Sequence, residues 1–377
     1  MLQDCDKLIV AHSLGRVGAQ EWNALAGTQP MLQHEYLRAL ETSGCATQAT
    51  GWSPHHFLLY RNDQLVAAMP TYLKAHSRGE YVFDHAWAHA YARHGLPYYP
   101  RLLSAIPFTP VQGPRLLAHT DADRLRLAQA AIRMARNHDL SSWHVLFPDP
   151  QDAAILQQAG LMIRDAVQFH WINRDYPSMT EFLADLRQKH RKNIRQSRRQ
   201  LKEAGVSFEW HEGNDIDDQT LQFFYRCYVE TYIERGQRPY LTHHFFESLV
   251  QTMASQLLIV TAHQYGEPVA SALFYRDEQK LYGRYWGCLR FVSGLHFETC
   301  YLQGIEYAIH NGLAVFEGGA QGEHKLARGL QPTRVCSAHW ISHPAFAKAI
   351  DEYVRTEGEA VEQYTDILRQ HEPFRQR

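Results

Sequence analysis

A glycine-rich segment near the C-terminus brings several ionisable side chains together. Residues 318–328 read GGAQGEHKLAR and contain Gln321, Glu323, His324, Lys325 and Arg328. A reaction in which a nucleophile attacks a carbonyl group needs an acceptor for the proton of the nucleophile and donors for the developing oxyanion. Glu323 or His324 could accept the proton, and Lys325 or Arg328 could stabilise the oxyanion or bind phosphate. The alternative is a polar loop that only ends a strand, but this many ionisable groups beside glycines favour a site.

A histidine and a glutamate stand at the start of a helix that the sequence predicts over residues 295–311. Glu298 lies four residues before Leu302 and therefore on the apolar side of this helix. A carboxylate in apolar surroundings has a raised pKa, which suits a general base, and His296 is a second candidate beside it. The alternative is that Glu298 only stabilises the first turn through the helix dipole.

A predicted strand over residues 281–287 carries an arginine and a tryptophan two positions apart. Alternation along a strand sends Arg284 and Trp286 to one face and Tyr285 to the other. The first face could line a substrate cleft. A buried tryptophan with an arginine exposed at the strand end is an equally good interpretation.

A long helix predicted over about residues 179–204 precedes these elements, and its second part is basic. Eight Lys or Arg residues and no acidic residue lie between Arg187 and Lys202. Ile194 and Leu201 give one narrow apolar stripe, so most of the cations must face solvent. Like charges at i,i+4 spacing repel one another, and a patch without partners favours a polyanion such as tRNA over a merely solvated face. We expect exposed side chains without carboxylate partners at Arg191, Arg195 and Arg198.

The tract of residues 77–113 lacks clear strand periodicity, which is typical of a functional loop. Tyr98, Tyr99 and Arg101 in this tract could stack on a substrate and contact phosphate. We therefore expect the tract to help close the substrate cleft.

Histidine is abundant, with 23 residues in the chain. Asp84, His85 and His89 stand at a helical spacing that can bind zinc, but no H-E-x-x-H motif accompanies them. We expect no metal, and we interpret His85 as part of a polar wall of the acceptor pocket.

The elements that must position these residues form two similar cycles. Hairpins predicted over residues 55–73 and 257–275 are each followed by helices and a closing strand. The closing strands share a tripeptide, His170-Trp171-Ile172 and His339-Trp340-Ile341. The two cycles are offset by 203 residues at the hairpins and by 169 residues at the closing strands. The first cycle therefore has about 34 more residues between these two landmarks than the second, which matches the length of the tract 77–113. Strands interleaved with helices indicate an α/β architecture with mixed sheets.

Bulk composition excludes several classes of protein. The 377 residues are too many for one hydrophobic core, so two domains are expected. The net charge of −2 excludes a general polycation, and the six scattered cysteines form no C-x-x-C pair. The start of the sequence does not resemble a signal peptide, and no stretch approaches the about 20 apolar residues of a membrane span. We expect a cytoplasmic protein.

Longer stretches resemble a known family. KHRKNIRQSRRQLKEAGV (189–206) and LYGRYWG (281–287), with VFEGGAQGEH (315–324), resemble the second domain of FemAB-type transferases. The distinctive stretches YLKAHSRGEYVFDHAWAHAY, PYYPRLL, PFTPVQGPRLL, LHFETCYLQGIEYAI and GAQGEHKLARGLQPT are similar to a bacterial family of FemAB-like, peptidoglycan-biosynthesis-like N-acyltransferases.

The resemblance implies two tandem domains of the acetyltransferase (GNAT) type. The first would span residues 1–175 with an insertion at 77–113, and the second would span 176–377 with the basic helix and a C-terminal helix. It also implies no tightly bound cofactor and a donor that is either aminoacyl-tRNA or acyl-CoA. The Q/R-x-x-G-x-G/A pattern of coenzyme A-dependent enzymes is not evident, which favours aminoacyl-tRNA.

The expected activity is N-acyl transfer from an aminoacyl or acyl donor to a small-molecule amine acceptor. One alternative is a coenzyme A-dependent N-acetyltransferase on the same fold. A second, from another class, is a non-catalytic protein that binds RNA or another polyanion. For the first activity, we expect Glu298, Glu323, His324 and Lys325 to converge in one pocket, because the reacting groups must work within hydrogen-bond reach.

Overall fold

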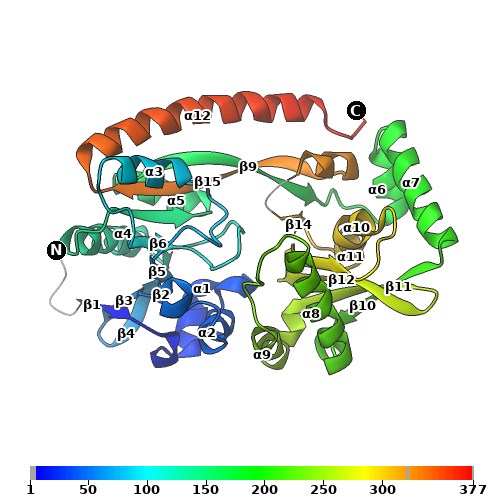
Figure 1. The fold of residues 1–377 in the computed structure, drawn as a ribbon, viewed down its shortest axis with the longest axis horizontal. Helices are drawn as coiled ribbons and strands as arrows, with labels where there is room; N and C mark the ends of the chain where they lie inside the picture. The colour runs from blue at the N-terminus through cyan, green and yellow to red at the C-terminus, as the bar shows by residue number, and fades with distance from the viewer. Residues whose placement is uncertain (1–5, 320–321, 376–377) are drawn as a thin grey trace. The chain divides into compact units, whose positions relative to one another are not determined.

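A computed structural model describes residues 6–319 and 322–375 of the chain (Figure 1). The chain forms two compact units. Unit 1 contains the chain up to Val167 together with Arg334–Tyr364, and unit 2 contains Gln168–Thr333 together with the chain from Thr365. The chain passes between the units within β9 (Met162–Ile172), β15 (Gln331–Ile341) and α12 (Pro344–Gln370). This division differs from the two continuous halves that the sequence predicts.

The two closing strands explain the difference. Residues 170–172 of β9 pair antiparallel with β14 (Val315–Glu317) and complete the sheet of unit 2. Residues 337–341 of β15 pair antiparallel with β8 (Ser142–Leu146) and complete the sheet of unit 1. Each shared His-Trp-Ile tripeptide therefore closes the sheet of the other cycle, which sequence spacing alone does not reveal.

Unit 1 contains two groups of strands. The first has the order β1-β3-β4-β7, and all its pairs are antiparallel. The second has the order β15-β8-β6-β5-β2, in which β6 and β8 are parallel. Asn62 and Asp63 connect β3 and β4 in the left-handed conformation that tight hairpins require, with φ of 49° and 59°. The bounds are β1 Asp6–Ala11, β2 Trp52–Pro54, β3 His56–Arg61, β4 Gln64–Met69, β5 Thr71–Lys74, β6 Arg101–Ser104 and β7 Leu117–Ala118.

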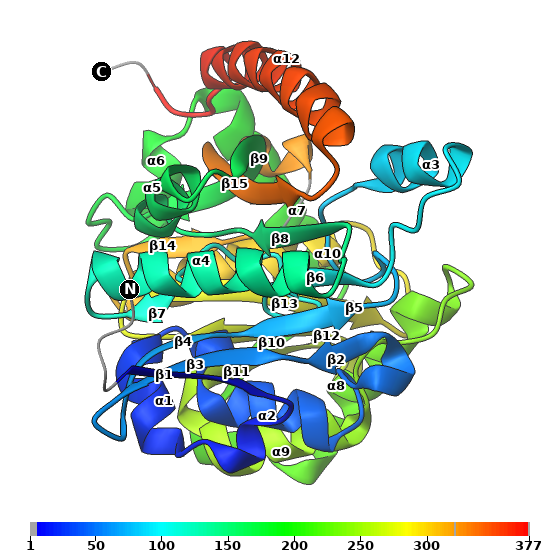
Figure 2. The same ribbon diagram turned by 90° about the vertical axis from the view of Figure 1, so that its left-hand side faces the viewer.

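Helices cover the apolar face of these strands. The helix α4 (Asp121–Asn137) begins at Thr120, whose hydroxyl accepts a hydrogen bond from the Asp123 backbone N–H. The helix α4 packs on β6 and β8 (Figure 2). Its Leu127, Ala131 and Ala135 are buried in a core that also holds Trp143 of β8. The remaining helices of this unit are α1 Ala19–Ala26, α2 His34–Thr42, α3 His85–Arg93 and α5 Pro150–Gln158.

The tract 77–113 is not a simple loop. It contains the helix α3 and the strand β6, which lies between β5 and β8 in the sheet. Trp87 and Tyr91 of α3 pack in a buried cluster with Ile350 and Val354 of α12. The sequence prediction of a loop without strands is therefore wrong for residues 101–104, where the short run RLLS gives too little alternation to read.

Unit 2 contains a sheet of order β10-β11-β12-β13-β14-β9. Its pairs are antiparallel except β13 and β14, which are parallel. The helix α8 (Asp218–Ile233) packs so closely on β13 that only glycine fits at position 287. A Cβ at Gly287 would lie 1.7 Å from the carbonyl oxygen of Cys227. The strand bounds are β10 Val206–Glu212, β11 Leu257–Gln264, β12 Glu267–Arg276 and β13 Lys280–Cys288.

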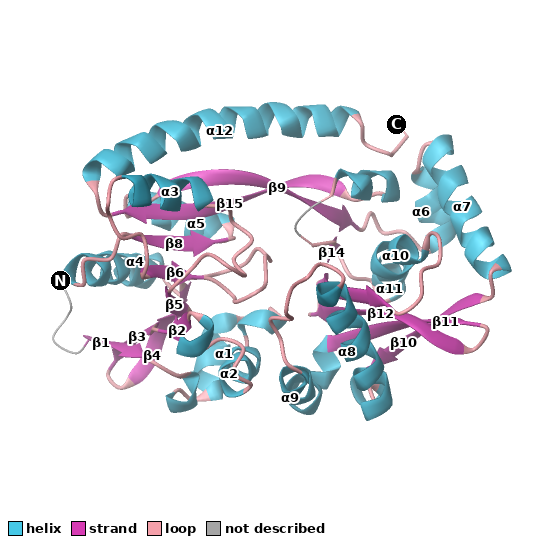
Figure 3. Ribbon diagram, in the orientation of Figure 1, coloured by secondary structure: helices cyan, strands magenta, loops and turns pink. Residues whose placement is uncertain are grey.

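The helices of unit 2 lie on both faces of this sheet (Figure 3). Tyr285 of β13 contacts Tyr228 of α8, whereas Trp286 contacts His296 on the other face. The predicted helix 295–311 is interrupted by one π-helical turn, Glu298–Leu302, between α10 and α11. The bounds are α6 Met179–Asp185, α7 Gln188–Glu203, α8 Asp218–Ile233, α9 His243–Met253, α10 Leu295–Phe297 and α11 Gln303–His310.

The single helix that the sequence predicts over residues 179–204 is two helices. Leu186 and Arg187 have extended backbone, with ψ of 149° and 146°, and they separate α6 from α7. Leu186 pairs instead with Phe374, so a contact distant in sequence overrides local helix propensity. Within residues 6–319 and 322–375, no helix is long and apolar enough to cross a bilayer.

Candidate functional site

A cavity lies in unit 2 where β13 and β14 stop pairing. Their parallel ladder covers only Lys280–Tyr282 and Val315–Glu317. The residue that follows the ladder is a glycine in both segments, Gly283 after the first and Gly318 after the second. The β12–β13 register also shifts at this point. The cavity has a volume of about 130 Å³. It is lined by Ala272, Leu273, Phe274, Gly283, Arg284, Tyr285, Trp286, His296, Cys300, Tyr301, Gly318 and Gly319.

The π-helical turn sets which side chains of the helix reach this cavity. Cys300 and Tyr301 line it from within Glu298–Leu302, and His296 lines it from the preceding turn. Single π-helical turns occur frequently at functional sites. Because this turn changes the angular spacing, the 3.6-residue periodicity of the sequence does not reveal Cys300 and Tyr301 as lining residues.

Lys325 does not line the cavity but adjoins its wall through Gly319, from the short 3₁₀ turn Glu323–Arg328. Its side chain is buried, and Nζ donates a hydrogen bond of 2.7 Å to the carbonyl oxygen of Gly319. Gly319 has a φ of 84°, which favours glycine and turns this carbonyl toward the lysine. Burial lowers the pKa of Lys325 to about 8, and the charge of Arg284 lowers it further against the effect of the Cys300 thiol. At neutral pH this lysine is therefore mainly a cation.

His296 is a neutral imidazole inside the cavity. Its ring centroid lies 5.2 Å from that of Trp286 and 5.6 Å from that of Tyr301. Burial lowers the pKa of His296 to about 4, and nearby cations act in the same direction. A neutral imidazole can accept a proton, although a pKa this low makes His296 a weak base.

His324 and Arg328 lie next to this group without lining the cavity. His324 Nε2 is 3.3 Å from the Tyr301 hydroxyl, and Arg328 lies with its guanidinium carbon 3.7 Å from the centroid of the Phe297 ring. Burial lowers the pKa of His324, and the charges of Lys325 and Arg328 lower it further. Together these contacts connect the glycine-rich segment to the cavity wall through Tyr301.

Glu298 does not point into the cavity. It is 3% exposed and accepts hydrogen bonds from Arg198 and Gln303. Burial raises the pKa of Glu298, while Arg198 opposes this shift. The raised pKa agrees with the expectation, but the two carboxylate oxygens accept hydrogen bonds from Arg198 and Gln303, and Glu298 is absent from the cavity wall. The side chain of Glu323 is exposed and is also absent from the cavity wall. Gln321 lies outside the described residues.

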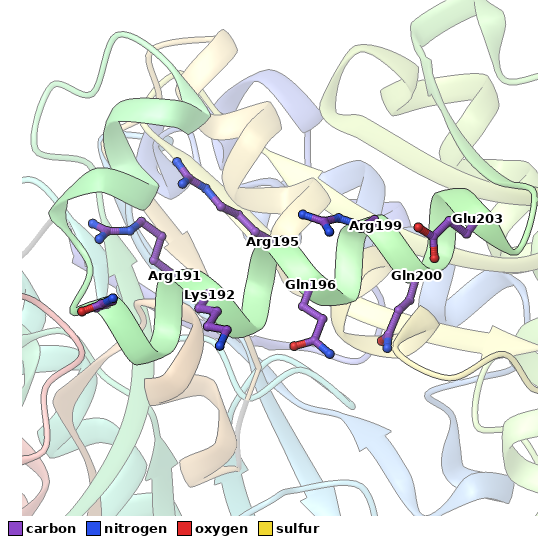
Figure 4. Close-up of a pocket in the computed structure, with 8 residues that line it drawn as sticks. Arg191, Lys192, Arg195, Gln196, Arg199, Gln200 and Glu203 are labelled. Atoms are coloured by element: carbon purple, nitrogen blue, oxygen red, sulfur yellow. The ribbon is translucent and has the colours of Figure 1, made fainter.

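The basic helix α7 has two different faces. Its outer face forms an open groove of about 570 Å³, lined by Gln188, Arg191, Lys192, Arg195, Gln196, Arg199, Gln200 and Glu203 (Figure 4). Lys192, Arg195 and Arg199 are exposed on this face. Arg191 is half-buried and donates to the Ala184 carbonyl oxygen.

The expectation for Arg198 is wrong. Its guanidinium lies 2.7 Å from a carboxylate oxygen of Glu298 and 2.7 Å from one of Glu306. A signal for this was present in the sequence, because Arg198 lies four residues after Ile194 and three before Leu201, next to the buried stripe. The cation that completes the outer face is Arg199.

For two residues of the tract 77–113, the expectation that they contact a substrate or a phosphate is also wrong. Arg101 is 1% exposed, and its Nη2 lies 2.8 Å from Asp84 and also contacts Glu80. The Tyr98 hydroxyl is buried and donates to Asp84. Both residues therefore satisfy buried carboxylates and have no surface for a phosphate or a base.

The other two insertion residues belong to unit 1. Tyr99 is half-buried with its hydroxyl 2.6 Å from that of Ser77, and His85 is exposed on α3. Across the two described ranges, no group of three potential metal ligands is found.

Comparison with known proteins finds one matching family and several solved structures with a similar fold. The model of the FemAB-like family, described as peptidoglycan biosynthesis/recognition, matches residues 13–376. Among solved structures, FemX has a TM-score of 0.56 at 11% identity over 92% of this chain and 100% of that chain. The C-terminal domain of a protein named lysylphosphatidylglycerol synthetase from Agrobacterium fabrum has a TM-score of 0.53 at 9% identity over 89% and 96%. L-PGS from Bacillus licheniformis has a TM-score of 0.51 at 10% identity, over 87% of this chain and 97% of that chain.

These likenesses confirm the predicted fold, a mixed α/β structure with tandem acetyltransferase-like units. No curated protein matches the sequence.

Proposed function

Because this chain belongs to the FemAB-like family, we propose that it is an N-acyltransferase that moves an aminoacyl or acyl group onto an amine in peptidoglycan-related metabolism. The observation that carries the proposal is the cavity between the ends of β13 and β14, with the buried cation of Lys325 next to its wall. In the acetyltransferase fold this opening between the central strands admits the acyl donor. A cation held at such an opening suits a reaction in which negative charge develops on a carbonyl oxygen.

The proposed step breaks the ester or thioester bond of the donor and forms an amide bond to the acceptor nitrogen. The amine loses one proton, and the leaving oxygen or sulfur gains one. Lys325 stabilises the oxyanion of the tetrahedral intermediate, and its depressed pKa also lets it donate a proton to the leaving group. The neutral His296 is the cavity-lining group that accepts the proton of the amine. Glu298 and Arg198 hold the π-helical turn and do not contact reactants.

The outer face of α7 supports aminoacyl-tRNA as the donor. Lys192, Arg195 and Arg199 present exposed charge along one side of the helix, and Glu203 at its end is the sole acid lining that groove. A row of cations of this kind suits a phosphate backbone. The coenzyme A-dependent reaction is the alternative on the same fold, and a polyanion-binding protein without turnover is the alternative from another class.

The donor and the activity are tested together. Extracts of cells with and without the protein are compared by mass spectrometry, and the transferred group is identified from the mass shift of an amine-bearing metabolite. We expect the shift to require Lys325 and to disappear when RNase is added to the reconstituted reaction. Dependence on added acyl-CoA with no effect of RNase would favour the coenzyme A alternative. Salt-sensitive RNA binding without any mass shift would contradict an acyltransferase.

A further inference from the structure

Three large apolar side chains of unit 2 are exposed at one end of its sheet. Tyr265 lies in the turn between β11 and β12, and Leu289 and Phe291 follow directly after β13. Their exposed fractions are 76%, 40% and 88%. Scattered exposed apolar side chains are ordinary, whereas a group of them at one place marks a binding surface. We call these three residues the apolar tip.

Hydrogen bonds hold the two segments of the apolar tip together. The backbone N–H of Leu289 donates to the carbonyl oxygen of Val269, near the start of β12. Arg290 Nη1 donates to Oε1 of Gln264, the residue before Tyr265, over 3.4 Å. The three apolar side chains therefore belong to one surface, although they come from separate segments of the chain.

The C-terminal end of the basic helix α7 adjoins the apolar tip. The side chain of Gln264 donates a hydrogen bond of 3.0 Å to the carbonyl oxygen of Ala204, where this helix ends. The next residue of the chain is Gly205, and a Cβ at this position would lie 2.3 Å from the ring of Tyr265. The cations of α7 and the apolar tip are therefore neighbours on unit 2.

The turn between β11 and β12 does not itself call for a tyrosine. Tyr265 has a φ of 53°, in the left-handed region that is unfavourable for a bulky side chain. In the β3–β4 turn, Asn62 and Asp63 take the same conformation, and these residue types tolerate it well. Tyr265 therefore strains the turn while most of the residue stays exposed. Strain of this kind is typical of functional positions.

The charges next to the apolar tip favour an anionic partner. Arg290 is exposed within the tip, and Lys202 is exposed on the last turn of α7. The helix α7 contains seven Lys or Arg residues and one acid, Glu203. Glu267 of β12 is a second exposed acid near the tip. The cations outnumber these acids even without Arg198, whose charge is paired.

The chemistry of the apolar side chains favours a lipid bilayer among the anionic partners. Aromatic rings can also stack on the bases of RNA. An aliphatic side chain such as that of Leu289 gains little from stacking but gains much from transfer into hydrocarbon. Aromatic and aliphatic side chains that protrude beside cations are typical of a membrane interface, where long cationic side chains place their charge among the headgroups.

We propose that the apolar tip docks unit 2 on the surface of an anionic lipid bilayer. Its three apolar side chains enter the boundary between headgroups and hydrocarbon, and Arg290 and Lys202 contact lipid phosphates. Neither cation lines the groove on the outer face of α7, so this contact is separate from the surface proposed for tRNA. The docking goes beyond the proposed function and is measured without turnover.

Co-sedimentation with vesicles tests the docking. The vesicles contain phosphatidylcholine alone or equal parts of phosphatidylcholine and phosphatidylglycerol. We expect the unmodified protein to bind the mixture more tightly than phosphatidylcholine alone. The double variant Tyr265→Asn with Phe291→Ser should weaken binding to both by about tenfold or more, while the asparagine suits the turn. The variant Phe291→Trp should keep the binding, because tryptophan is enriched at membrane interfaces.

The contribution of charge is tested separately. The variants Arg290→Gln and Lys202→Gln should each weaken binding to the mixture by about fivefold and leave binding to phosphatidylcholine nearly unchanged. The matched control is Phe83→Ser, which removes an aromatic side chain with 60% exposure from unit 1 and should change neither. Circular dichroism and thermal unfolding establish that each variant is folded.

Three results would overturn the inference. The first is that the unmodified protein binds neither kind of vesicle. The second is that the double variant binds as tightly as the unmodified protein, or that Phe83→Ser weakens binding as much as the double variant does. The third is that the double variant loses affinity for bulk tRNA and not for vesicles, which would make the apolar tip a stacking surface for RNA.

Discussion

Arg198 of α7 lies 2.7 Å from Glu298 of the π-helical turn, and this ion pair connects the basic helix to the wall of the cavity. Arg198 also contacts Glu306 of α11, eight residues after Glu298, so one guanidinium contacts two carboxylates of consecutive helical segments. Because of this ion pair, Glu298 contacts Arg198 and is absent from the cavity wall, and Arg198 is absent from the outer face of α7. The cations available to a polyanion are consequently the exposed Lys192, Arg195 and Arg199 on the outer face of α7.

Removal of Arg198 should destabilise unit 2. Loss of one partner of a buried pair costs about 3–5 kcal/mol because the other charge stays buried without compensation. Arg198 is 26% exposed, so solvent screening reduces the expected loss to about 2 kcal/mol for Arg198→Met. The loss for Glu298→Gln should be smaller, because a neutral amide needs no counter-ion. Urea unfolding measures the stability of both variants, with Arg195→Met at an exposed position as the control. Equal stability of all three variants would contradict a stabilising role of the ion pair between Arg198 and Glu298.

Replacement of Lys325 should reduce activity without unfolding the protein. Removal of one oxyanion-stabilising donor typically lowers kcat by about 10²–10³. We expect a loss of this order for Lys325→Met when acyl transfer is followed by mass spectrometry. Because the pKa of Lys325 is about 8, the cation is lost as the pH rises through that value. The rate of the unmodified protein should therefore fall above about pH 8. A rate that keeps rising to pH 9 would show that the neutral amine is the active form.

The pair His144 and His339 should make unit 1 sensitive to acid. Their Nδ1 atoms are 2.6 Å apart, so they share one proton, and both rings are fully buried. Burial holds the pKa of His339 at about 3 and that of His144 well below its usual value. Below the unfolded value of about 6.5, the unfolded chain binds protons that the folded chain refuses, so stability falls as the pH falls.

Urea unfolding between pH 8 and pH 5 measures this dependence. Each histidine contributes a slope of up to about 1.4 kcal/mol per pH unit below pH 6.5. The variant His339→Gln should lower the measured slope by the contribution of one histidine, while the exposed His85→Gln should leave it unchanged. The buried His170 and His296, whose pKa values are also lowered, supply a part of the slope that neither variant changes. A slope that His339→Gln does not alter would place the acid sensitivity elsewhere.

Charge on the outer face of α7 should control binding of tRNA. Replacement of Lys192, Arg195 and Arg199 by glutamine should weaken binding of bulk tRNA and make its salt dependence shallower by about two to three units. Replacement of the exposed Arg133 and Lys348 of unit 1 removes two positive charges from another surface and serves as the control. The thermal unfolding of all variants should stay the same. Equal effects of the two sets would mean that the binding reflects overall charge and not α7.

The sequence by itself determined the elements that local signals encode. The hairpin predicted over residues 55–73 is present as β3 and β4, with Asn62 and Asp63 at its turn, because a hairpin joins residues close in the chain. The strand that carries Arg284 and Trp286, with the helix after it, was likewise predicted from periodicity. Tyr285 and Trp286 lie on opposite faces of it, as alternation requires.

Only the tertiary structure decided what depends on contacts distant in sequence. The two His-Trp-Ile strands close each other's sheets, since strand pairing is chosen by the edges available in the folded chain and not by order in the sequence. Arg101 is buried by carboxylates that stand some twenty residues away. The π-helical turn rotates Cys300 and Tyr301 into the cavity and leaves Glu298 facing Arg198, about a hundred residues earlier. Local periodicity gives the faces of a helix, but the partner that covers each face is fixed only when distant segments pack.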